Sequence, residues 1–379
     1  MNADLISFHA CLIDCMSLQN STHRAETIKV QGERSKRIEI RILYLVTITI
    51  IVTAMRSLRI APFLVVIISL LSCSKEDAGP SNTNPGSLTP KDSVYVTGVW
   101  DTGAAYWHNG NTTNLDPGVN FYPTSICVSN TDIFVAGSTR DAAGKVQAVL
   151  LKNGVSTELH DGTNVTNAFA VAVSGSGVFV AGTADSSGVQ IAIVWKNGVA
   201  SHLPNGERAK SIFISGSDVY VAGPTQFKAN YTPAYWKNGD YIKLSNENSF
   251  TEGIAVAGTD VYVSGTRGDG SALYWKNGVV NNLTSSGIYA VTSISVSGTD
   301  VYVGGFRVTG KIRNVMYWKN GIAAILTNDG ITGQIQVSGS DVYLAGGVNK
   351  VGSGLRATFW KNGRPTDLGS GTATGVFVK

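Results

Sequence analysis

A unit of about 41 residues occurs seven times between Ser93 and Lys379, and this repeat constrains the fold more than any other feature. Each unit has an apolar triplet with a central aromatic residue, and a Gly follows two residues later. The central aromatics lie 39 to 45 residues apart, at positions Tyr95, Phe134, Phe179, Tyr220, Tyr262, Tyr302 and Tyr343. A fixed period in this range, built from short strands and tight turns, is typical of a β-propeller with one blade per unit.

An Asn-Gly pair closes a second hairpin in every unit, and a Trp precedes it by two residues in six units, with Leu151 in the seventh. Asn-Gly between apolar runs is a strong hairpin signal, because both central residues of a type I′ turn need positive φ. Both faces of the triplet strand are apolar, which implies that neighbouring blades cover both. We therefore expect the Trp and Tyr columns to form the core between blades.

The two ends of the repeat region are complementary. It begins with a second strand, at 93–98, and it ends with an unpartnered copy of a first strand, at 372–378. We therefore predict an all-β fold over residues 92–379. It is a single seven-bladed β-propeller of four-stranded antiparallel blades, closed by pairing of the C-terminal strand with the N-terminal blade.

Residues 55–72 have the organisation of a secretory signal peptide. A basic segment at 55–59 precedes an apolar run of twelve residues at 60–71. This run is too short to span a bilayer core of about 30 Å. The sequence Leu-Leu-Ser-Cys at 70–73 resembles the lipobox of bacterial lipoproteins, which implies that Cys73 is acylated and anchors the protein in a membrane. The alternative is a Cys that happens to follow a transmembrane helix.

Residues 73–91 are rich in Pro, Ser, Asn and Gly, as in a flexible tether. Ser74 after the Cys resembles the outer-membrane sorting rule of Gram-negative bacteria. Lys-Glu-Asp at 75–77 resembles a signal for display on the cell surface, or it is a solvated start of the linker. We expect a lipid-anchored outer-membrane protein exposed at the cell surface. The alternative is a position on the periplasmic face of that membrane.

Residues 1–54 lie upstream of a complete signal, so we expect them to be a misassigned N-terminal extension with Met55 as the true start. A leader with two hydrophobic segments is the alternative. Beyond the leader only Cys73 and Cys127 remain, so no disulfide framework is expected and Cys127 is read as a packing residue.

The units resemble extracellular repeats of the HAF type, through the sequence Ala-Thr-Phe-Trp-Lys-Asn-Gly at 357–363 followed by Leu368. The sequence at 215–223, Ser-Gly-Ser-Asp-Val-Tyr-Val-Ala-Gly, is similar to repeat arrays of bacterial lipoproteins of unknown function. This resemblance implies a propeller fold and an extracellular setting, and it brings no established reaction.

No catalytic, metal or cofactor site is predicted. Sialidase boxes, Gly-x-Ser-x-Gly, His-Glu-x-x-His and calcium-loop spacings do not occur, and the histidines beyond the leader occupy unrelated positions. The net charge of +4 comes mainly from the first 72 residues, since the remainder carries 22 basic and 21 acidic residues. Nucleic acid is therefore not an expected partner. Asp residues that close the Ser-Gly-Ser-Asp turns are expected to make turn hydrogen bonds.

Binding residues are expected at one rim. The Ser-Gly-Ser-Asp and Lys-Asn-Gly turns share one end of the blades, and loops of varied length and chemistry share the other, at 99–104, 138–147, 183–190, 224–233, 266–271, 306–314 and 347–356. The candidate ligand-binding residues are Trp100, Arg140, Phe227, Tyr231, Arg307, Lys311, Arg313, Lys350 and Arg356. Five cations in the last two loops, with no acid there, favour a partly anionic ligand, or they are ordinary solvated charges.

Two hypotheses for function follow. The first is a surface-tethered lipoprotein whose propeller is a non-catalytic binding or scaffold module for a glycan or an envelope protein. The alternative is an extracellular polysaccharide hydrolase or lyase with its site at the channel mouth. The lack of a catalytic motif favours the first.

Overall fold

The computed structural model describes residues 92–100, 103–115, 120–140, 142–162, 165–186, 188–227 and 230–379. Within these ranges all helical or extended secondary structure is β-strand, and neighbouring strands pair antiparallel. A helix long and apolar enough to cross a membrane is not found among the described residues. The extension, the signal peptide, Cys73 and the tether all lie outside them.

Five sheets have four strands each. Their strands are β4 (Asn120–Ser129), β5 (Asp132–Arg140), β6 (Val146–Lys152) and β7 (Val155–Leu159); β8 (Val165–Ser174), β9 (Gly177–Ser186), β10 (Val189–Lys196) and β11 (Val199–His202); β12 (Ser211–Ser215), β13 (Asp218–Phe227), β14 (Asn230–Lys237) and β15 (Asp240–Lys243); β16 (Ser249–Ala257), β17 (Asp260–Arg267), β18 (Ala272–Lys276) and β19 (Val279–Asn282); and β20 (Ile288–Ser297), β21 (Asp300–Thr309), β22 (Ile312–Lys319) and β23 (Ile322–Thr327).

The sixth sheet has seven strands, in the order β24-β25-β26-β27-β1-β2-β3. Its strands are β24 (Gly330–Ser338), β25 (Asp341–Lys350), β26 (Gly354–Lys361), β27 (Arg364–Val378), β1 (Val94–Trp100), β2 (Gly103–His108) and β3 (Asn111–Leu115). The first part of β27 pairs with β26, and its last part pairs with β1, with Val94 opposite Val378. One continuous strand therefore merges two sets of strands that the sequence predicts as separate four-stranded blades.

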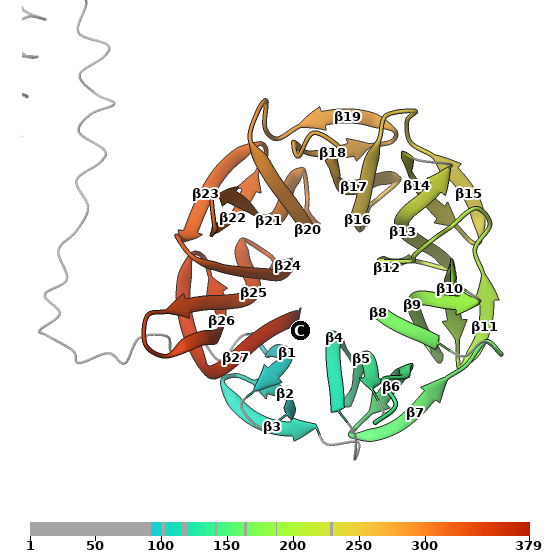
Figure 1. Cartoon of the computed structure of the whole chain (residues 1–379), viewed down its shortest axis with the longest axis horizontal. Helices are drawn as coiled ribbons and strands as arrows, with labels where there is room; N and C mark the ends of the chain where they lie inside the picture. Colours follow the sequence, from blue (N-terminus) through green and yellow to red (C-terminus); the bar gives the residue numbers. More distant parts are fainter. Residues whose placement is uncertain are drawn as a thin grey trace, which may run out of the picture. The chain divides into compact units, whose positions relative to one another are not determined.

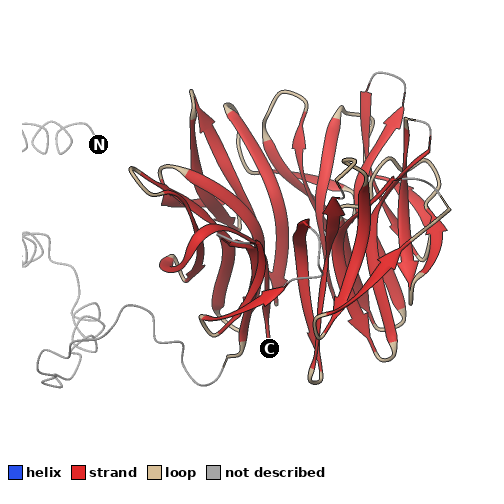
Figure 2. Ribbon diagram, turned by 60° about the horizontal axis from the view of Figure 1, so that its bottom comes forward, coloured by secondary structure: helices blue, strands red, loops and turns tan. Residues whose placement is uncertain are grey.

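The sheets stand around a common axis, and the first strand of each sheet lies nearest to it (Figure 1). The inner strands contact one another in the order β4, β8, β12, β16, β20, β24 and β27, and β27 contacts β4 again. Viewed from the side, the connections gather at two opposite ends of the strands (Figure 2). This radial arrangement of antiparallel sheets is propeller-like.

Threonine hydroxyls join the inner strands of successive sheets. Thr124 Oγ1 donates to the carbonyl of Ala168 at 3.1 Å, so β4 is bonded to β8. Thr374 Oγ1 donates in the same way to the carbonyl of Pro123 at 2.9 Å, which bonds β27 to β4. The last strand is thus tied both to β1 and to the next sheet.

The Trp column forms the core between sheets, as predicted. Trp107, Trp195, Trp236, Trp275, Trp318 and Trp360 are all at most 1% exposed. Leu151 fills the same position in its unit and is equally buried. Cys127 is buried as well, and this burial raises the pKa of its thiol to about 11, so it is a packing residue and not a thiolate nucleophile.

A repeated set of contacts joins the two turns at one end of most sheets. In the unit of β21, the Oδ1 of Asn320 accepts the N–H of Val301 at 2.8 Å, and its Nδ2 donates to Asp300 at 2.8 Å. Lys319 pairs with Asp300 at 2.8 Å and lies 5.2 Å from the centre of the Tyr302 ring. We call this set of side chains a clasp.

Clasps recur around the molecule. The equivalent Asp, Lys and Asn are Asp132, Lys152 and Asn153; Asp218, Lys237 and Asn238; Asp260, Lys276 and Asn277; and Asp341, Lys361 and Asn362. The Asn backbones have φ of 50° to 53°, a left-handed conformation that Asn tolerates better than most residues. The Lys-Asn-Gly and Ser-Gly-Ser-Asp motifs are therefore explained by fold stability.

Candidate functional site

We call the end of the strands opposite the clasps the variable end. Segments that were expected to be loops there are partly strand, because the strands continue into them. β21 reaches Thr309 and β22 starts at Ile312, so Arg307 and Arg313 lie on paired strands. The Arg307 guanidinium lies 5.9 Å from the ring centre of Tyr289, and that of Arg313 lies 5.4 Å from that of Phe306. Lys311 is exposed in the turn between these strands.

Lys350 and Arg356 were expected to have no acidic residue nearby, but the structure pairs each of them with one. Both pair with Asp367 of β27, at 2.7 Å and 3.0 Å. Partial burial acts to raise the pKa of Asp367, but hydrogen bonds from Lys350, Gly369 N–H and Arg356 lower it to about 2. The expected group of five uncompensated cations is therefore corrected to three. The acid was missed because it lies on the following strand and not in the loop.

The other four candidates are spread over three sheets. Trp100 packs against the core beside β27. Arg140 is exposed and its Nη1 donates to the carbonyl of Gly144 at 3.3 Å. Phe227 ends β13, and its side chain lies outside the described part of the structure. The Tyr231 ring packs against Phe250 with 4.2 Å between ring centres.

Of these four, Tyr231 lines a cavity at this end of the strands. The cavity has a volume of about 540 Å³, and we call it the Glu207 pocket. Its lining residues are Gly188, Val189, Gln190, Ile191, Leu203, Asn205, Gly206, Glu207 and Tyr231. They come from the start of β10, the link between β11 and β12, and β14.

Glu207 is the most unusual residue of this pocket, since it is a carboxylate with only 7% of its surface exposed. Its Oε1 pairs with Nη2 of Arg208 at 2.9 Å, and Arg208 Nε donates to Oε1 of Gln190 at 2.8 Å. Its Oε2 is buried and has no hydrogen-bond partner among the described residues. A buried acceptor left unsatisfied costs about 1–3 kcal/mol, and a turn of the Glu207 carboxylate toward the cavity would let this oxygen accept a hydrogen bond from a ligand and relieve that cost.

The pocket exists because one unit departs from the repeat. β12 has five residues, whereas the other first strands have nine or more, and residues 203–210 ahead of it form an irregular link. Gly223 of β13 permits this path, because a Cβ there would overlap the carbonyl of Arg208. The N–H of Glu207 donates to the Pro224 carbonyl at 3.1 Å, which fixes the link over β13.

Sequence reasoning missed Glu207, Arg208 and Gln190. It chose the candidate binding residues from the loops that connect strands within a sheet, and it chose none from the links between sheets. The available signal was the turn sequence Pro-Asn-Gly at 204–206, which marks an irregular connection. The unpartnered oxygen itself depends on side-chain packing and has no sequence signal.

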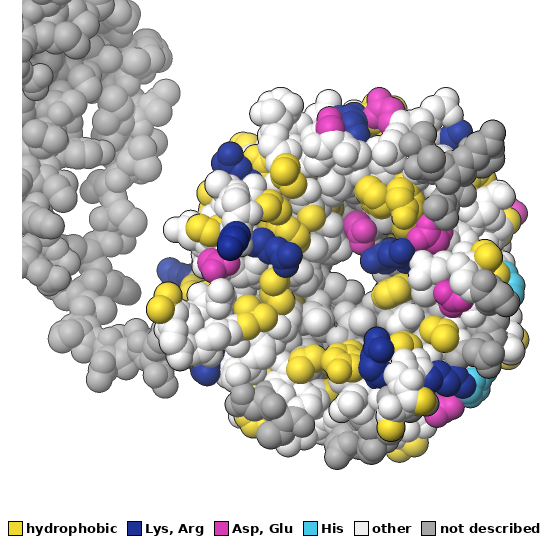
Figure 3. Space-filling view, viewed as in Figure 1, with side chains coloured by type: hydrophobic (Ala, Val, Ile, Leu, Met, Phe, Trp, Pro, Cys, Tyr) yellow, Lys and Arg dark blue, Asp and Glu magenta, His cyan; other side chains and the backbone are white. Residues whose placement is uncertain are grey.

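A second ion pair lies beside the same link. Lys210 pairs with Glu252 of β16 at 3.6 Å, and its Nζ lies 5.0 Å from the centre of the Phe169 ring. Burial raises the pKa of Glu252, and the nearby Lys210 and Arg208 oppose this rise. Basic and acidic side chains gather beside the central opening of the face drawn in Figure 3. A group of three or more His, Cys, Asp or Glu side chains able to hold a metal is not found among the described residues.

No protein-family model matches the sequence, and no curated protein matches it. Solved structures are similar at low identity. The β-propeller domain of the Trilobed protease from Pyrococcus furiosus is 8% identical, over 65% of this chain and 82% of that one, with a TM-score of 0.43. A computationally designed protein is 18% identical, over 68% and 79%, with a TM-score of 0.42. Pyrococcus horikoshii acylaminoacyl peptidase is 12% identical, and the match covers 65% of this chain and 46% of the peptidase, with a TM-score of 0.43.

Proposed function

We propose that this protein is a non-catalytic binding module for a neutral glycan, and that the Glu207 pocket is its binding site. The observation that carries the proposal is the buried Glu207 Oε2 without a partner, in a cavity of about 540 Å³. Ligand sites commonly combine such a cavity with a few convergent polar groups.

The chemistry of the lining supports a polyhydroxyl ligand. Arg208 already balances the charge of Glu207, so the missing partner is a neutral donor such as a sugar hydroxyl and not a second cation. Tyr231 offers a ring with an apolar face and a polar hydroxyl. Gln190 and Asn205 add amides that donate and accept hydrogen bonds.

Binding is favoured over the alternative of a hydrolase. Glycoside hydrolysis usually needs two carboxyl groups that flank the scissile bond. Among the described residues that line the pocket, only Glu207 carries a carboxylate. Glu252 is nearby in the fold, but it pairs with Lys210 and is not part of this lining.

The setting that we propose is the surface of a Gram-negative cell, with the protein held by lipid on Cys73 and a tether over residues 73–91. We count the two halves of the seven-stranded sheet as two blades that share β27, which gives a seven-bladed propeller. In this proposal the pocket faces away from the constant rim of clasps, where recognition would meet the same turns in most units.

Glu207→Gln tests the proposal, because it keeps the shape of the side chain and removes the charged acceptor. We expect the full chain, purified in detergent, to bind neutral glycans on an array and in calorimetry. The variant should bind at least tenfold more weakly, since about 1.4 kcal/mol corresponds to a factor of ten. Ile312→Ala, an exposed change at the same end of the strands, is the control. Equal affinity of the Glu207 variant and the parent would refute the assignment of this pocket.

A further inference from the structure

A second cavity opens at the same end of the strands as the Glu207 pocket. Its volume is about 330 Å³, and we call it the Tyr122 pocket. It is lined by Tyr122, Thr124, Ser138, Thr139, Arg140, Val146, Asn167, Ala168 and Phe169. Arg140 ends β5 and Val146 begins β6, which is the connection equivalent to the one between β9 and β10 at the Glu207 pocket.

The two pockets share an aromatic ring and a carboxamide, although the Glu207 carboxylate has no counterpart among the described residues that line the Tyr122 pocket. Each has a tyrosine, and Tyr122 is 50% exposed, so its ring is free to contact a ligand. Each also has a carboxamide, which is Asn167 in one and Gln190 in the other. An arginine is present in both places, although Arg208 supports the lining of its pocket through Glu207 and Gln190. Two pockets that each offer a tyrosine ring and a carboxamide suit a ligand whose units repeat.

One contact connects the segments that line the two pockets. Phe169, in the lining of the Tyr122 pocket, lies 5.0 Å from Nζ of Lys210. Lys210 follows Glu207 by three residues in the same link. The inner strands β8 and β12 that carry or adjoin these residues are also in contact. The Phe169–Lys210 contact therefore joins the lining of the Tyr122 pocket to the link that lines the Glu207 pocket.

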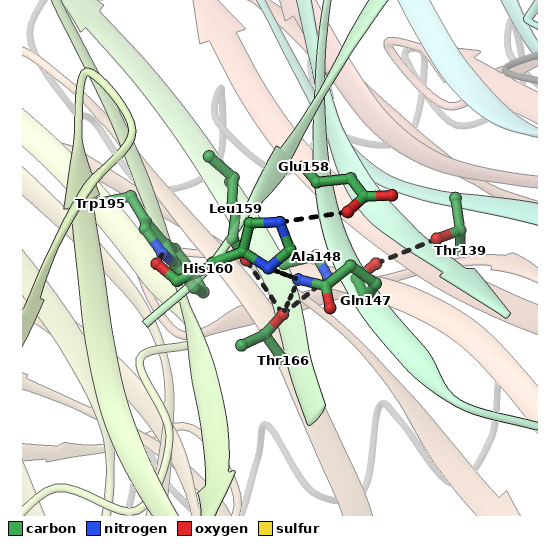
Figure 4. Close-up of polar contacts among 8 residues, drawn as sticks. All are labelled: Thr139, Gln147, Ala148, Glu158, Leu159, His160, Thr166 and Trp195. Carbon is green, nitrogen blue, oxygen red and sulfur yellow. Dashed lines mark hydrogen bonds and ion pairs between the residues drawn. The ribbon is translucent and has the colours of Figure 1, made fainter. Parts of the chain in front are cut away.

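The wall of the Tyr122 pocket is held by a buried polar network (Figure 4). Thr139, a lining residue, donates to the carbonyl of Gln147 at 3.4 Å, and Gln147 Nε2 donates to Thr166 Oγ1 at 2.8 Å. Thr166 in turn donates to the Leu159 carbonyl at 3.1 Å. A network with its members satisfied resists rearrangement, so little ordering cost is expected when a ligand binds.

We infer that the ligand is a linear glycan whose sugar units occupy both pockets at once and whose chain passes over Phe169 and Lys210. This inference rests on the proposed function of the Glu207 pocket and names its ligand as a polymer rather than a single sugar. Occupation of the second pocket is an intramolecular event once the first is filled, so affinity grows with chain length until both are occupied.

The test is calorimetry of the full chain in detergent with cello-, xylo- and manno-oligosaccharides of one to six units. At least one series should show affinity that rises by tenfold or more and then levels off as the chain lengthens. Tyr122→Ala should remove this gain and leave the affinity for the shortest binding member of the series unchanged. Tyr122→Phe, which keeps the ring, should retain most of the gain, and Ile312→Ala should behave as the parent.

The outcomes separate the two proposals. Affinity that does not depend on length, with Glu207→Gln still weakening it, would overturn the two-pocket inference and leave the proposed function standing. An equal loss for short and long members in Tyr122→Ala would also overturn it, because the second pocket would then not be a separate subsite. Absence of binding for all three series would overturn both.

Discussion

At the residue scale, much of the repeat was open to prediction because its signals are local. Asn-Gly turns depend on backbone conformation alone, and Asn320 has the expected left-handed φ of 50°. The turn role of the aspartates was also expected, but their pairing with Lys and Asn of the neighbouring hairpin was not, since it joins residues about 20 positions apart. Glu207 was missed for the same reason, as its environment comes from three separate segments.

The clasps predict how stability depends on pH. Hydrogen bonds and ion pairing with Lys319 and Asn320 hold the pKa of Asp300 below its usual value, and the same holds for Asp260. A lowered pKa in the folded state stabilises the fold above the unfolded pKa of about 4, and this contribution is lost as the pH falls below it. Asp260→Asn combined with Asp300→Asn should therefore lower Tm at neutral pH.

The pH profile provides the check. The difference in Tm between the parent and the double variant should narrow as the pH falls from about 5 to about 3, as measured by scanning calorimetry. Asp240→Asn, an exposed residue without a clasp partner among the described contacts, is the control and should leave the profile unchanged. A difference that stays constant over this range would show that the carboxylates do not act through their charge.

At the scale of elements, hydrophobic periodicity was enough to predict the buried triplet strands such as β5 and β21, whereas mostly exposed outer strands such as β3 and β7 followed from the Asn-Gly turns before them. Their lengths were harder to predict. The expected loops at the variable end became paired strand, as at Arg307 and Arg313, because hairpin pairing continues as long as both chains remain extended. The short β12 and its irregular link were not expected, since they depend on the backbone contact that Gly223 permits.

Removal of residues 372–379 tests the role of β27. The truncation removes the pairing with β1 and the bond from Thr374 to Pro123, so it exposes one edge of β1. We expect a loss of stability greater than the ~1 kcal/mol of a common point mutation, together with self-association. Thermal unfolding and light scattering measure both. A truncated protein that melts like the parent and stays monomeric would contradict this role.

At the scale of the whole molecule, the number of repeats and the complementary ends led to the radial arrangement of sheets. The merging of two blades into one seven-stranded sheet is a detail that a strand count could not give, because it depends on β27 being unbroken across 364–378. The cellular location remains a prediction from residues 55–77, which lie outside the described part of the chain.

The lipid anchor has its own test. We predict that mature protein begins at Cys73, carries acyl chains there and partitions into detergent, whereas Cys73→Ala yields unlipidated protein. Intact mass spectrometry and phase partition measure this difference. Cys127→Ala is the matched control, because that thiol is buried in the described fold and should not affect acylation. Native material with unmodified Cys73 and residues 1–54 attached would disprove both the anchor and the start at Met55.

The sharing of β27 has a consequence for biosynthesis. Among the described strands a ribosome makes β1 before all others and its partner β27 after them, so one edge of β1 has no native neighbour while the strands between them are made. Nascent chains must keep this edge from pairing with other proteins, and a chain that stops early can never cover it. Residues 371–378 therefore act as a check that synthesis has passed through all the described strands, since both edges of β1 are paired only when they are present.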